Sequence, residues 1–425
     1  MAVRSSSSQI AIIGGGAAGF FAALRLKSLQ SNLEVVIYEK TAKLLQKVRI
    51  SGGGRCNVTH ACFEPKALTG YYPRGHKELR GPFHHFQPGD MIGWLEDRGI
   101  AVKTEADGRM FPESDQSQTI IDCFLEEGRK LGVAIRTQYG LESLVKDKDG
   151  SWRLSFRNQQ QERADAVLIA AGGDRNIWAL MESLGVKRQA VVPSLFTFRT
   201  PQSGLHHLAG VSTPVRLKIP EARLEDAGPL LITHRGFSGP SILRLSAWGA
   251  YALAEQQYRF TLKVNWADAE ADEVQAWMDE QRQMRGKKQV HNTPWPGMPR
   301  RLWQALIEAI PNTDCVWAEL KARQADAMVQ KLTADDIQVT GKDTNKEEFV
   351  TAGGIHRKAI DFRTMAVKQQ EGLFAAGEVI DIDALTGGFN FQAAWTGAWL
   401  AAEGVIHYLD ASYQPKNSID LPNST

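Results

Sequence analysis

The chain has 425 residues. One domain usually takes roughly 150, so two or three domains are expected and a single small module is excluded. Its 50 Lys and Arg balance 48 Asp and Glu to a net charge of +2, and 43% of its residues are hydrophobic, as in a globular protein. Nucleic-acid binding driven by bulk charge needs a strongly basic face, so no nucleic-acid partner is expected.

The apolar segments and the cysteines indicate a reducing, cytoplasmic setting without a membrane anchor. The longest stretch without polar side chains, residues 10–24, is shorter than the ~20 residues that span a bilayer, although a signal peptide is another interpretation of it. Residues 1–8, with four successive serines, predict a flexible lead-in. The four cysteines are too scattered for a disulfide scaffold or a zinc site, so no metal is expected. They are Cys56, Cys62, Cys123 and Cys315.

The first 40 residues carry a dinucleotide-binding fingerprint. Residues 9–13 form an apolar run that predicts a buried strand, residues 14–19 read Gly-Gly-Gly-Ala-Ala-Gly, and residues 20–29 have helical spacing. A second strand is expected over residues 33–38, and it ends at Glu39, 20 residues after Gly19. Strand, glycine turn, helix, strand and acid together predict a nucleotide site; a turn that only joins strand to helix is the alternative.

Each residue type in the fingerprint has a physical task. Gly14 allows the tight turn, Gly16 lets the backbone approach a pyrophosphate, and Gly19 lets helix and strand pack closely, so a Cβ is expected to clash at all three. Glu39 would accept hydrogen bonds from ribose hydroxyls and would disfavour a 2′-phosphate, which favours FAD or NAD over NADP. The cofactor contacts predicted here are Gly14, Gly16, Ala17, Ala18, Gly19, Glu39 and Lys40.

Two further glycine-rich segments lie far apart in the chain. Residues 51–57 read Ser-Gly-Gly-Gly-Arg-Cys-Asn, a loop dense in N–H donors that suits a phosphate or a flat ring; a mobile surface loop is the alternative. Residues 372–378 predict a strand that runs into Gly377 and Glu378, and a helix is expected from about Asn390 to Tyr408. The positive end of that helix would point toward electron-rich ring atoms.

With these segments the sequence resembles the BaiN/YhiN-like NAD(P)/FAD-dependent oxidoreductases, bacterial flavoproteins that include an aminoacetone oxidase. The resemblance covers residues 9–408. The chain departs from the family pattern at Leu45, His60 and Ala359, where Gly, Asn and an acid are usual, and these departures bear on the substrate and not on FAD. The motifs shared with the family are residues 14–19, 51–57, 107–112, 170–173, 233–240, 351–354 and 377–392.

The resemblance implies tightly held FAD and extends the set of cofactor contacts beyond the fingerprint. In flavoproteins of this fold the segment near Leu141 holds the adenine through backbone groups. The further contacts implied are Lys47, Gly52, Gly53, Gly54, Arg55, Cys56, Asn57, Leu141, Ala171, Gly172, Gly354, Gly377, Glu378, Gly388, Phe389, Asn390 and Phe391.

The fold class expected is α/β: a glutathione-reductase-type, Rossmann-like FAD domain with an inserted β-rich domain and a small helical domain. Alternating runs predict the β-rich part, and a charged stretch broken by three prolines predicts the helical part. The basic residues at 282–288 are interpreted as a solvated helix end; a surface that binds a partner is the alternative. The predicted boundaries are 1–190 for the first part of the FAD domain, 191–265 for the inserted domain, 266–345 for the helical part, 346–412 for the rest of the FAD domain, and 413–425 for a tail.

Two groups are candidates for chemistry. His234 lies in Thr-His-Arg-Gly-Phe-Ser-Gly-Pro, where Ser238 is predicted to cap a helix that has Pro240 in its first turn; the imidazole would orient substrate or carry a proton. An incidental histidine beside a cap is the alternative. Cys56 is the candidate redox thiol, with Cys62 as a partner in a dithiol.

The sequence therefore predicts an FAD-dependent oxidoreductase that moves hydride between flavin N5 and a small organic substrate or NAD(P)H. No second Gly-x-Gly-x-x-Gly follows residue 19 after a strand, so NAD(P)H would dock only transiently, or oxygen would reoxidise the flavin. Aminoacetone oxidation and enone reduction stay equally open. An FAD-dependent RNA-modifying enzyme and a flavin-binding sensor without turnover are the alternatives from other classes.

Overall fold

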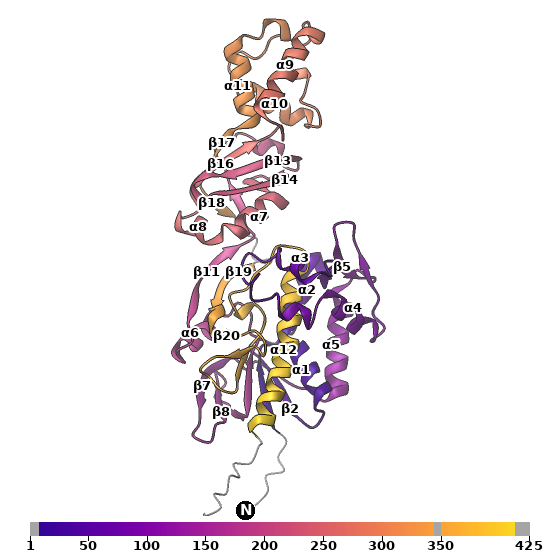
Figure 1. The fold of residues 1–425 in the computed structure, drawn as a ribbon, viewed down its shortest axis with the longest axis vertical. Coiled ribbons are helices and arrows are strands. Elements are labelled where there is room, and N and C mark those ends of the chain that lie inside the picture. Colours follow the sequence, from indigo (N-terminus) through magenta and orange to yellow (C-terminus); the bar gives the residue numbers. More distant parts are fainter. Residues whose placement is uncertain (1–7, 344–349, 413–425) are drawn as a thin grey trace, which may run out of the picture. The chain divides into compact units, whose positions relative to one another are not determined.

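The structure is a computed structural model that describes residues 8–343 and 350–412, and these fall into two compact units (Figure 1). Residues up to 191 and from 351 onward form the first unit, and residues 192–350 form the second. The chain passes between the units through β11 (Arg188–Ser194) and β19 (Val350–Ile355), which pair with each other. The predicted tail and most of the predicted lead-in lie outside the described residues.

The first unit is built on a seven-stranded sheet whose five strands β22, β10, β1, β2 and β6 are parallel. The predicted strand at residues 9–13 is confirmed, and the second strand ends at Glu39 as expected. In order across the sheet, the strands are β20 (Ile360–Asp361), β21 (Ala366–Val367), β22 (Leu373–Ala375), β10 (Ala166–Ile169), β1 (Gln9–Ile13), β2 (Glu34–Glu39) and β6 (Ala134–Thr137).

Two small antiparallel sheets and seven α-helices complete the described part of this unit. One sheet holds β3 (Thr59–His60), β5 (Arg109–Pro112) and β4 (Val102–Thr104), and the other holds β7 (Leu141–Lys146), β8 (Trp152–Phe156) and β9 (Gln161–Ala164). The helices are α1 (Ala17–Leu29), α2 (Gln46–Gly54), α3 (Pro65–Thr69), α4 (Pro88–Glu96), α5 (Ser117–Leu131), α6 (Arg175–Ser183) and α12 (Phe389–Ser412), and a 3₁₀ turn, η7 (Gly377–Val379), precedes α12.

The strand order places a ligand site at the end of β1. The chain runs from β1 to β2 on one side, whereas β10 pairs with β1 on the other, so the loops after β1 and β10 separate there. Ligands of open parallel sheets bind at such a switch point, at the carboxyl ends of the strands. The fingerprint turn follows β1, and Ala171 and Gly172 follow β10, so both predicted segments lie at this point.

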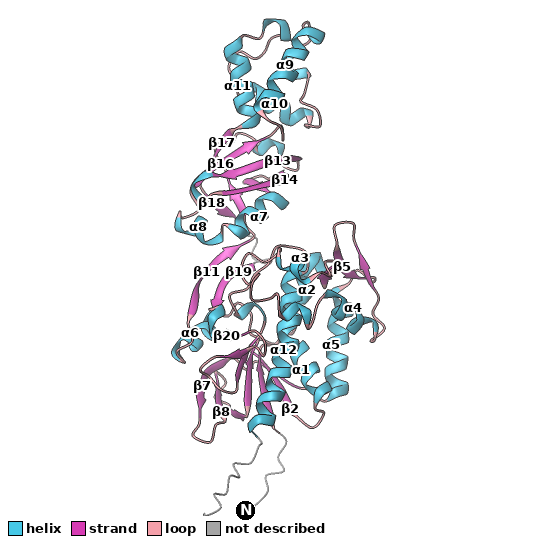
Figure 2. Cartoon of the chain, in the orientation of Figure 1, coloured by secondary structure: helices cyan, strands magenta, loops and turns pink. Residues whose placement is uncertain are grey.

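The second unit contains an antiparallel seven-stranded sheet and, at one end of the unit, the three helices α9 to α11 (Figure 2). Strands and helices share one apolar core, so the predicted division of residues 191–265 from 266–345 stays a prediction. In sheet order the strands are β17 (Asp335–Val339), β16 (Phe260–Asn265), β13 (Ser212–Ile219), β14 (Leu224–Ile232), β15 (Gly236–Ser238), β12 (Thr197–Arg199) and β18 (Gly341–Asp343). The helices are α7 (Pro240–Trp248), α8 (Ala250–Glu255), α9 (Ala271–Arg285), α10 (Arg300–Glu308) and α11 (Ala322–Thr333).

Helix α12, from the C-terminal part of the first unit, packs against α1 from its N-terminal part. The Phe21 and Trp395 rings meet there at 5.5 Å between centroids. Its buried polar side chains are satisfied: the Thr59 hydroxyl donates to Gln392 Oε1 (2.7 Å), and the Gln392 amide donates to the Thr396 hydroxyl (3.1 Å). All three side chains are 0% exposed, so water cannot reach them and these hydrogen bonds satisfy their polar groups instead.

This network predicts that Gln392→Met lowers the free energy of unfolding by about 1–3 kcal/mol, because the Thr59 hydroxyl is left buried without an acceptor. Denaturant unfolding of the full chain measures the loss. The double variant Thr59→Val with Gln392→Met removes both partners and should be less destabilised than the single one. Equal stability of the single variant and the native chain would contradict the role given to this network.

Candidate functional site

The glycine turn between β1 and α1 leaves room beside it for a ligand. A Cβ at Gly14, whose φ is 118°, would lie 2.4 Å from the Ala170 carbonyl oxygen, and one at Gly19 would lie 2.0 Å from that of Gly14. A Cβ at Gly16 would meet no protein atom within 4 Å. The protein itself accounts for the clash expected at Gly14 and Gly19. The open space at Gly16 lies next to the N-terminus of α1 and suits the approach of a pyrophosphate, so the clash expected there, with the ligand, stays a prediction.

Glu39 lies at the end of β2 as predicted, but its carboxylate is engaged within the protein. It accepts hydrogen bonds from the N–H groups of Gly15 and Thr41, each at 2.9 Å. A ribose would share or replace these bonds. Glu39 therefore stabilises the conformation of the glycine turn, and it also lines a cavity.

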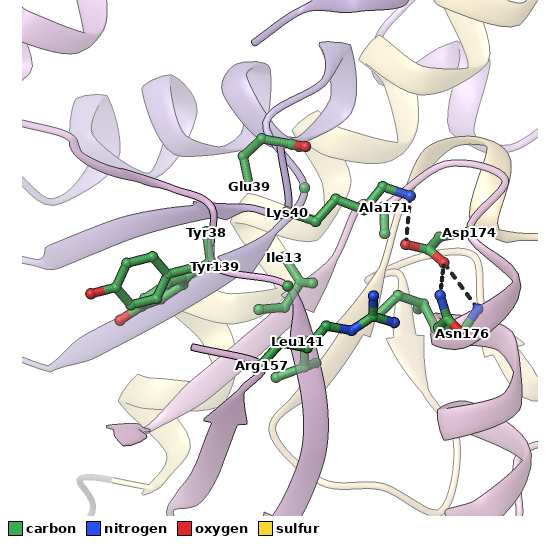
Figure 3. A pocket seen from close by; sticks show the side chains of 13 residues that line it. Ile13, Tyr38, Glu39, Lys40, Tyr139, Leu141, Arg157, Ala171, Asp174 and Asn176 are labelled. Carbon is green, nitrogen blue, oxygen red and sulfur yellow. Dashed lines mark hydrogen bonds and ion pairs between the residues drawn. The ribbon is translucent and has the colours of Figure 1, made fainter. Parts of the chain in front are cut away.

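A cavity that is partly open to solvent is lined by predicted residues from four segments (Figure 3). Gly14 follows β1, Glu39 ends β2 and Lys40 comes directly after it, Leu141 begins β7, and Ala171 follows β10. Rossmann-type sheets bind the adenosine part of a dinucleotide beside the acid of the fingerprint, and this cavity lies at that place in the fold. Five of the residues predicted from the sequence therefore line one cavity.

The same cavity is also lined by residues that were not predicted from the sequence, chiefly Tyr139, Arg157 and Asp174. Lys40 donates to Asp174 (2.9 Å), which also caps α6 by accepting from the Asn176 N–H (2.9 Å). Burial tends to raise the pKa of Asp174, but the hydrogen bonds from Lys40 and Asn176 lower it overall. An Asp directly before an apolar helix is a cap signal that the sequence offered for Asp174. Nothing in the sequence pointed to Arg157, which follows β8.

The predicted residues Lys47 and Glu378, 331 positions apart, form an ion pair between α2 and η7. The Glu378 carboxylate also lies beside the chain after β10, 3.6 Å from where a Cβ at Gly172 would be. A Cβ at Gly377 would lie 3.1 Å from that of Ala18 at the start of α1. Five predicted residues from four segments therefore meet next to the fingerprint turn.

A clamped loop precedes α12. The Asn390 side chain accepts from the Ala384 N–H (3.0 Å) and donates to the Ala384 carbonyl (3.1 Å), which closes residues 384–390 into a loop. Gly388 is pressed against the second glycine segment, since its Cβ would lie 2.5 Å from the Thr59 carbonyl oxygen. With its amide flipped, Asn57 accepts from the Gly388 N–H at 3.0 Å. Asn390 thus acts on the loop's shape, and a ligand would meet the loop's backbone.

Three rings stack beside this loop. The Phe389 ring lies 4.1 Å from that of Tyr71 and 4.5 Å from that of His60, nearly parallel to both. His60 Nε2 faces the Asp107 carbonyl oxygen at 3.1 Å, and burial lowers the pKa of the imidazole. Phe391, the other predicted aromatic contact, stacks on Trp395 at 5.5 Å.

The three glycines at 52–54 all have positive φ, between 57° and 85°, and form an exposed left-handed turn after the regular part of α2. The prediction of a donor-rich loop fits this turn. Arg55 is committed elsewhere: its guanidinium bonds Glu105 at 2.6 Å and lies over the Phe111 ring at 3.9 Å. The Arg55 guanidinium is thus held by protein groups, and its predicted cofactor contact stays a prediction.

Leu45, which stands where the family usually has Gly, adopts a glycine-like backbone conformation. Its backbone is left-handed (φ 54°, ψ 33°), its N–H donates to the Gly15 carbonyl at 2.8 Å, and its side chain is 1% exposed. A left-handed conformation costs a non-glycine residue roughly 1–2 kcal/mol, which burial of the leucine side chain offsets.

Cys56 does not have the environment of a redox thiol. The residue is 0% exposed, and burial raises the pKa of its thiol to about 12, although the hydrogen bond with Ser51 acts in the opposite direction. Reactive cysteines have lowered pKa values and accessible sulfur atoms. The structure therefore contradicts the catalytic role predicted for Cys56 and supports a packing role.

The predictions around His234 have mixed outcomes. His234 is exposed in the turn between β14 and β15, and its predicted role in proton transfer or substrate orientation stays a prediction. Pro240 begins α7 as expected, but Ser238 does not cap the helix: Gly239, with φ 98°, is the N-cap residue. Ser238 belongs instead to β15, where its hydroxyl faces that of Thr197 at 3.3 Å.

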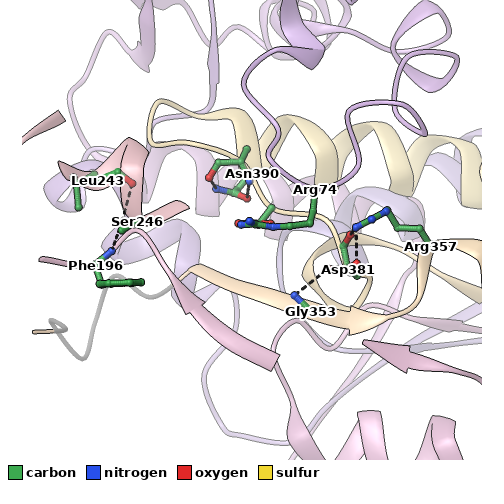
Figure 4. Close-up of polar contacts among 10 residues, drawn as sticks. Arg74, Phe196, Leu243, Ser246, Gly353, Arg357, Asp381 and Asn390 are labelled. Carbon is green, nitrogen blue, oxygen red and sulfur yellow. Dashed lines mark hydrogen bonds and ion pairs between the residues drawn. The ribbon is translucent and has the colours of Figure 1, made fainter. Parts of the chain in front are cut away.

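A buried ion pair fixes the start of the segment that leads to α12 (Figure 4). Arg74, 7% exposed, binds both carboxylate oxygens of Asp383, which is 0% exposed. Next to it Asp381 accepts from Arg357 and from the Gly353 N–H (3.0 Å). A Cβ at Gly354 would lie 2.5 Å from the Val379 carbonyl oxygen, so protein packing accounts for this glycine and its predicted cofactor contact is not needed.

Comparison with known proteins identifies the family. Residues 8–404 match the family model described as "HI0933-like protein Rossmann domain". The chain belongs to this family. The HI0933-like match spans both units, which agrees with the predicted resemblance over residues 9–408.

Relatives of this HI0933-like protein carry two kinds of names. A "Ribosomal RNA dihydrouridine synthase" of Escherichia coli K12 is 29% identical over 93% of this chain and 97% of its own. A "3-dehydro-bile acid delta(4,6)-reductase" of Clostridium scindens is 26% identical over 92% and 98%. The 3-ketosteroid-delta4-(5alpha)-dehydrogenase of Rhodococcus jostii RHA1 shares the fold, with a TM-score of 0.51, 14% identity and coverage of 95% and 97%.

The predicted class is therefore confirmed: the chain is an FAD-dependent oxidoreductase with a Rossmann-type domain. The open space at Gly16 and the cavity beside Glu39 fit that cofactor. The expectation of no nucleic-acid partner is not supported, because relatives carry a ribosomal RNA name. Among the described residues, no helix has the length and apolarity that a membrane crossing requires.

The geometry at the turn predicts that Gly16→Ala folds with unchanged stability but binds FAD at least tenfold more weakly, because its new methyl group enters only the ligand's space. Fluorescence titration of the apoprotein with FAD measures the affinity, and thermal unfolding of the apoprotein measures the stability. Gly19→Ala is the control: it should lose stability even without FAD. Native affinity in Gly16→Ala would contradict the placement of the cofactor.

Burial of Cys56 predicts a pH effect on stability. The native thiol keeps its proton up to about pH 12, whereas the unfolded thiol loses it near pH 9, so its contribution is complete below pH 9 and falls between these values. Cys56→Ala should flatten the fall in the free energy of unfolding between pH 9 and pH 11. Cys62→Ala, at a partly exposed thiol, should keep most of that slope. A native chain labelled rapidly at Cys56 at pH 8 would contradict the assignment.

Proposed function

We propose that this protein saturates a carbon–carbon double bond conjugated to a carbonyl group. The observation that carries the proposal is the chemistry shared by the two names found among its full-length relatives. Dihydrouridine forms when the C5–C6 double bond of uracil, conjugated to the C4 carbonyl, takes up two hydrogens. A delta(4,6)-reductase of a 3-dehydro bile acid acts on double bonds conjugated to the 3-oxo group.

When bound, reduced FAD supplies a hydride from N5, which goes to the β-carbon of such a substrate while a proton goes to the α-carbon. The chain's own part is to hold the cofactor and exclude water from it. We assign the pyrophosphate to the backbone of residues 16–18, where the α1 N-terminus offers unpaired N–H groups. The adenosine is assigned to the cavity beside Glu39, Lys40 and Leu141.

The remaining predicted contacts are assigned to the flavin end. The exposed left-handed turn of Gly52, Gly53 and Gly54 and the clamped loop of residues 384–390 lie against each other through Asn57 and Gly388. Both present backbone N–H groups, which suit an electron-rich ring edge. The Lys47–Glu378 ion pair is assigned a place between these two segments and the pyrophosphate, where it offers the cofactor one positive and one negative group. NAD(P)H, docking transiently, is the proposed electron donor.

A uridine within RNA is the substrate that we favour within this class. Two relatives, from Escherichia coli and Haemophilus influenzae, carry the ribosomal RNA name at 29% and 27% identity over 97% and 98% of their lengths. The near-neutral net charge of +2 does not oppose this, because a local basic surface is sufficient for RNA binding. A small cyclic enone is the alternative of the same chemistry.

Anaerobic stopped-flow mixing tests the proposal. The holoenzyme should be bleached by NADH or NADPH, and the reduced enzyme should be reoxidised by a cyclic enone or a uridine-containing RNA but not by the saturated ketone. Lys47→Ala should slow both half-reactions or lower the FAD content, because it leaves Glu378 unpaired at the cofactor site. A flavin that is reduced by an amine and reoxidised only by oxygen would overturn the proposal in favour of an oxidase. A flavin that no donor reduces would favour the sensor.

A further inference from the structure

The helical end of the second unit contains a long segment with basic residues and no acidic ones. Residues 281–307 include six Lys or Arg and lack Asp and Glu altogether, in a chain that has 48 acidic residues among 425. The six are Arg282, Arg285, Lys287, Lys288, Arg300 and Arg301. Positive and negative charges nearly balance over the whole chain, but residues 281–307 carry an excess of positive charge.

Folding places five of these residues at the surface. Arg285, Lys287, Lys288, Arg300 and Arg301 are exposed at the end of α9, in the following turn and at the start of α10, and we call these five the basic surface. Met284 beside them is 73% exposed.

The backbone under the basic surface is held firmly. The N–H groups of Ala318 and Trp317 donate to the carbonyls of Gly286 and Lys288, each at 3.0 Å. The Arg300 guanidinium bonds the Asn292 side chain at 2.6 Å, which ties the start of α10 to the turn after α9. The charges are therefore presented on a fixed scaffold.

The positive charge of the basic surface is not neutralised by the protein. In the part of the chain that the structure describes, none of the five side chains takes part in an ion pair, whereas neighbouring Arg282 faces Asp279 at 3.7 Å. Asp314 on the adjoining segment faces His291 at 3.6 Å. Of the five, Arg301 donates to the His207 carbonyl at 3.4 Å, which leaves its charge unneutralised. Clustered Lys and Arg without acidic partners are the electrostatic footprint of phosphate-backbone binding.

We propose that the basic surface binds the phosphate backbone of the RNA whose uridine the flavin reduces. The inference rests on the proposed RNA substrate. The surface lies outside the flavin-binding unit, so its cations contribute affinity and leave the hydride transfer to a free enone unchanged. Each phosphate contact steepens the dependence of log K on log salt by about 0.7–0.9.

Filter binding of the holoenzyme to transcribed ribosomal RNA, at several salt concentrations, tests the inference. Lys287→Ala with Lys288→Ala should weaken binding about tenfold and reduce the salt slope by about 1.5, because two phosphate contacts are lost. Lys321→Ala with Arg323→Ala is the matched control, with the same loss of charge from exposed positions of the same unit, and it should bind as the native protein does.

The outcomes separate this inference from the proposed function. Unchanged flavin content and enone reoxidation in the Lys287 and Lys288 variant, together with weaker RNA binding, support the basic surface. Native-like binding by that variant, an equal loss in the control, or no RNA binding by the native protein would each overturn it, even if the enone is reduced. Failure of enone reoxidation alongside surface-dependent RNA binding would overturn only the proposed reaction.

Discussion

The cofactor site depends on the pairing of β22 with β10 in the parallel sheet. That pairing brings residues 377–392 back to a glycine turn that the chain left more than 350 residues earlier. Without it Glu378 would not reach Lys47, and Gly388 would not meet Asn57. The turn itself needs only local sequence, but a closed site needs the long-range strand pair and the helix that follows it.

Most of the site's polar groups are satisfied before any ligand arrives. Glu39 holds the Gly15 N–H, Asn390 holds Ala384, and Arg74 is matched by Asp383. The site is thus preorganised by bonds that FAD would partly exchange and partly keep. Exchange of one hydrogen bond for another changes the free energy little, so these bonds fix the geometry of the site more than its affinity for FAD.

The sequence was informative where function depends on local backbone. The order of elements in the fingerprint was predicted correctly, although α1 begins at Ala17 and not at Phe20, because a strand, a tight turn and a helix leave few alternatives for glycine. The sequence was less informative where a side chain's partners come from elsewhere: Arg55 bonds Glu105, and the Cys56 thiol, predicted to be redox-active, is buried. Ser238 lost the cap because Gly239 takes the positive φ required there. Arg157 reaches the cavity only through the β7–β8 sheet, which no local pattern encodes.

The interrupted first unit also sets an order of events during synthesis. Residues 192–350 are continuous in the chain and can fold as soon as they emerge, whereas the sheet of the first unit waits for β22 and α12 near the end. Domains fold as units during translation at roughly 5–20 residues per second. The growing chain therefore carries an unfinished nucleotide site for many seconds, and the site can close on FAD only after β22 and α12 have emerged.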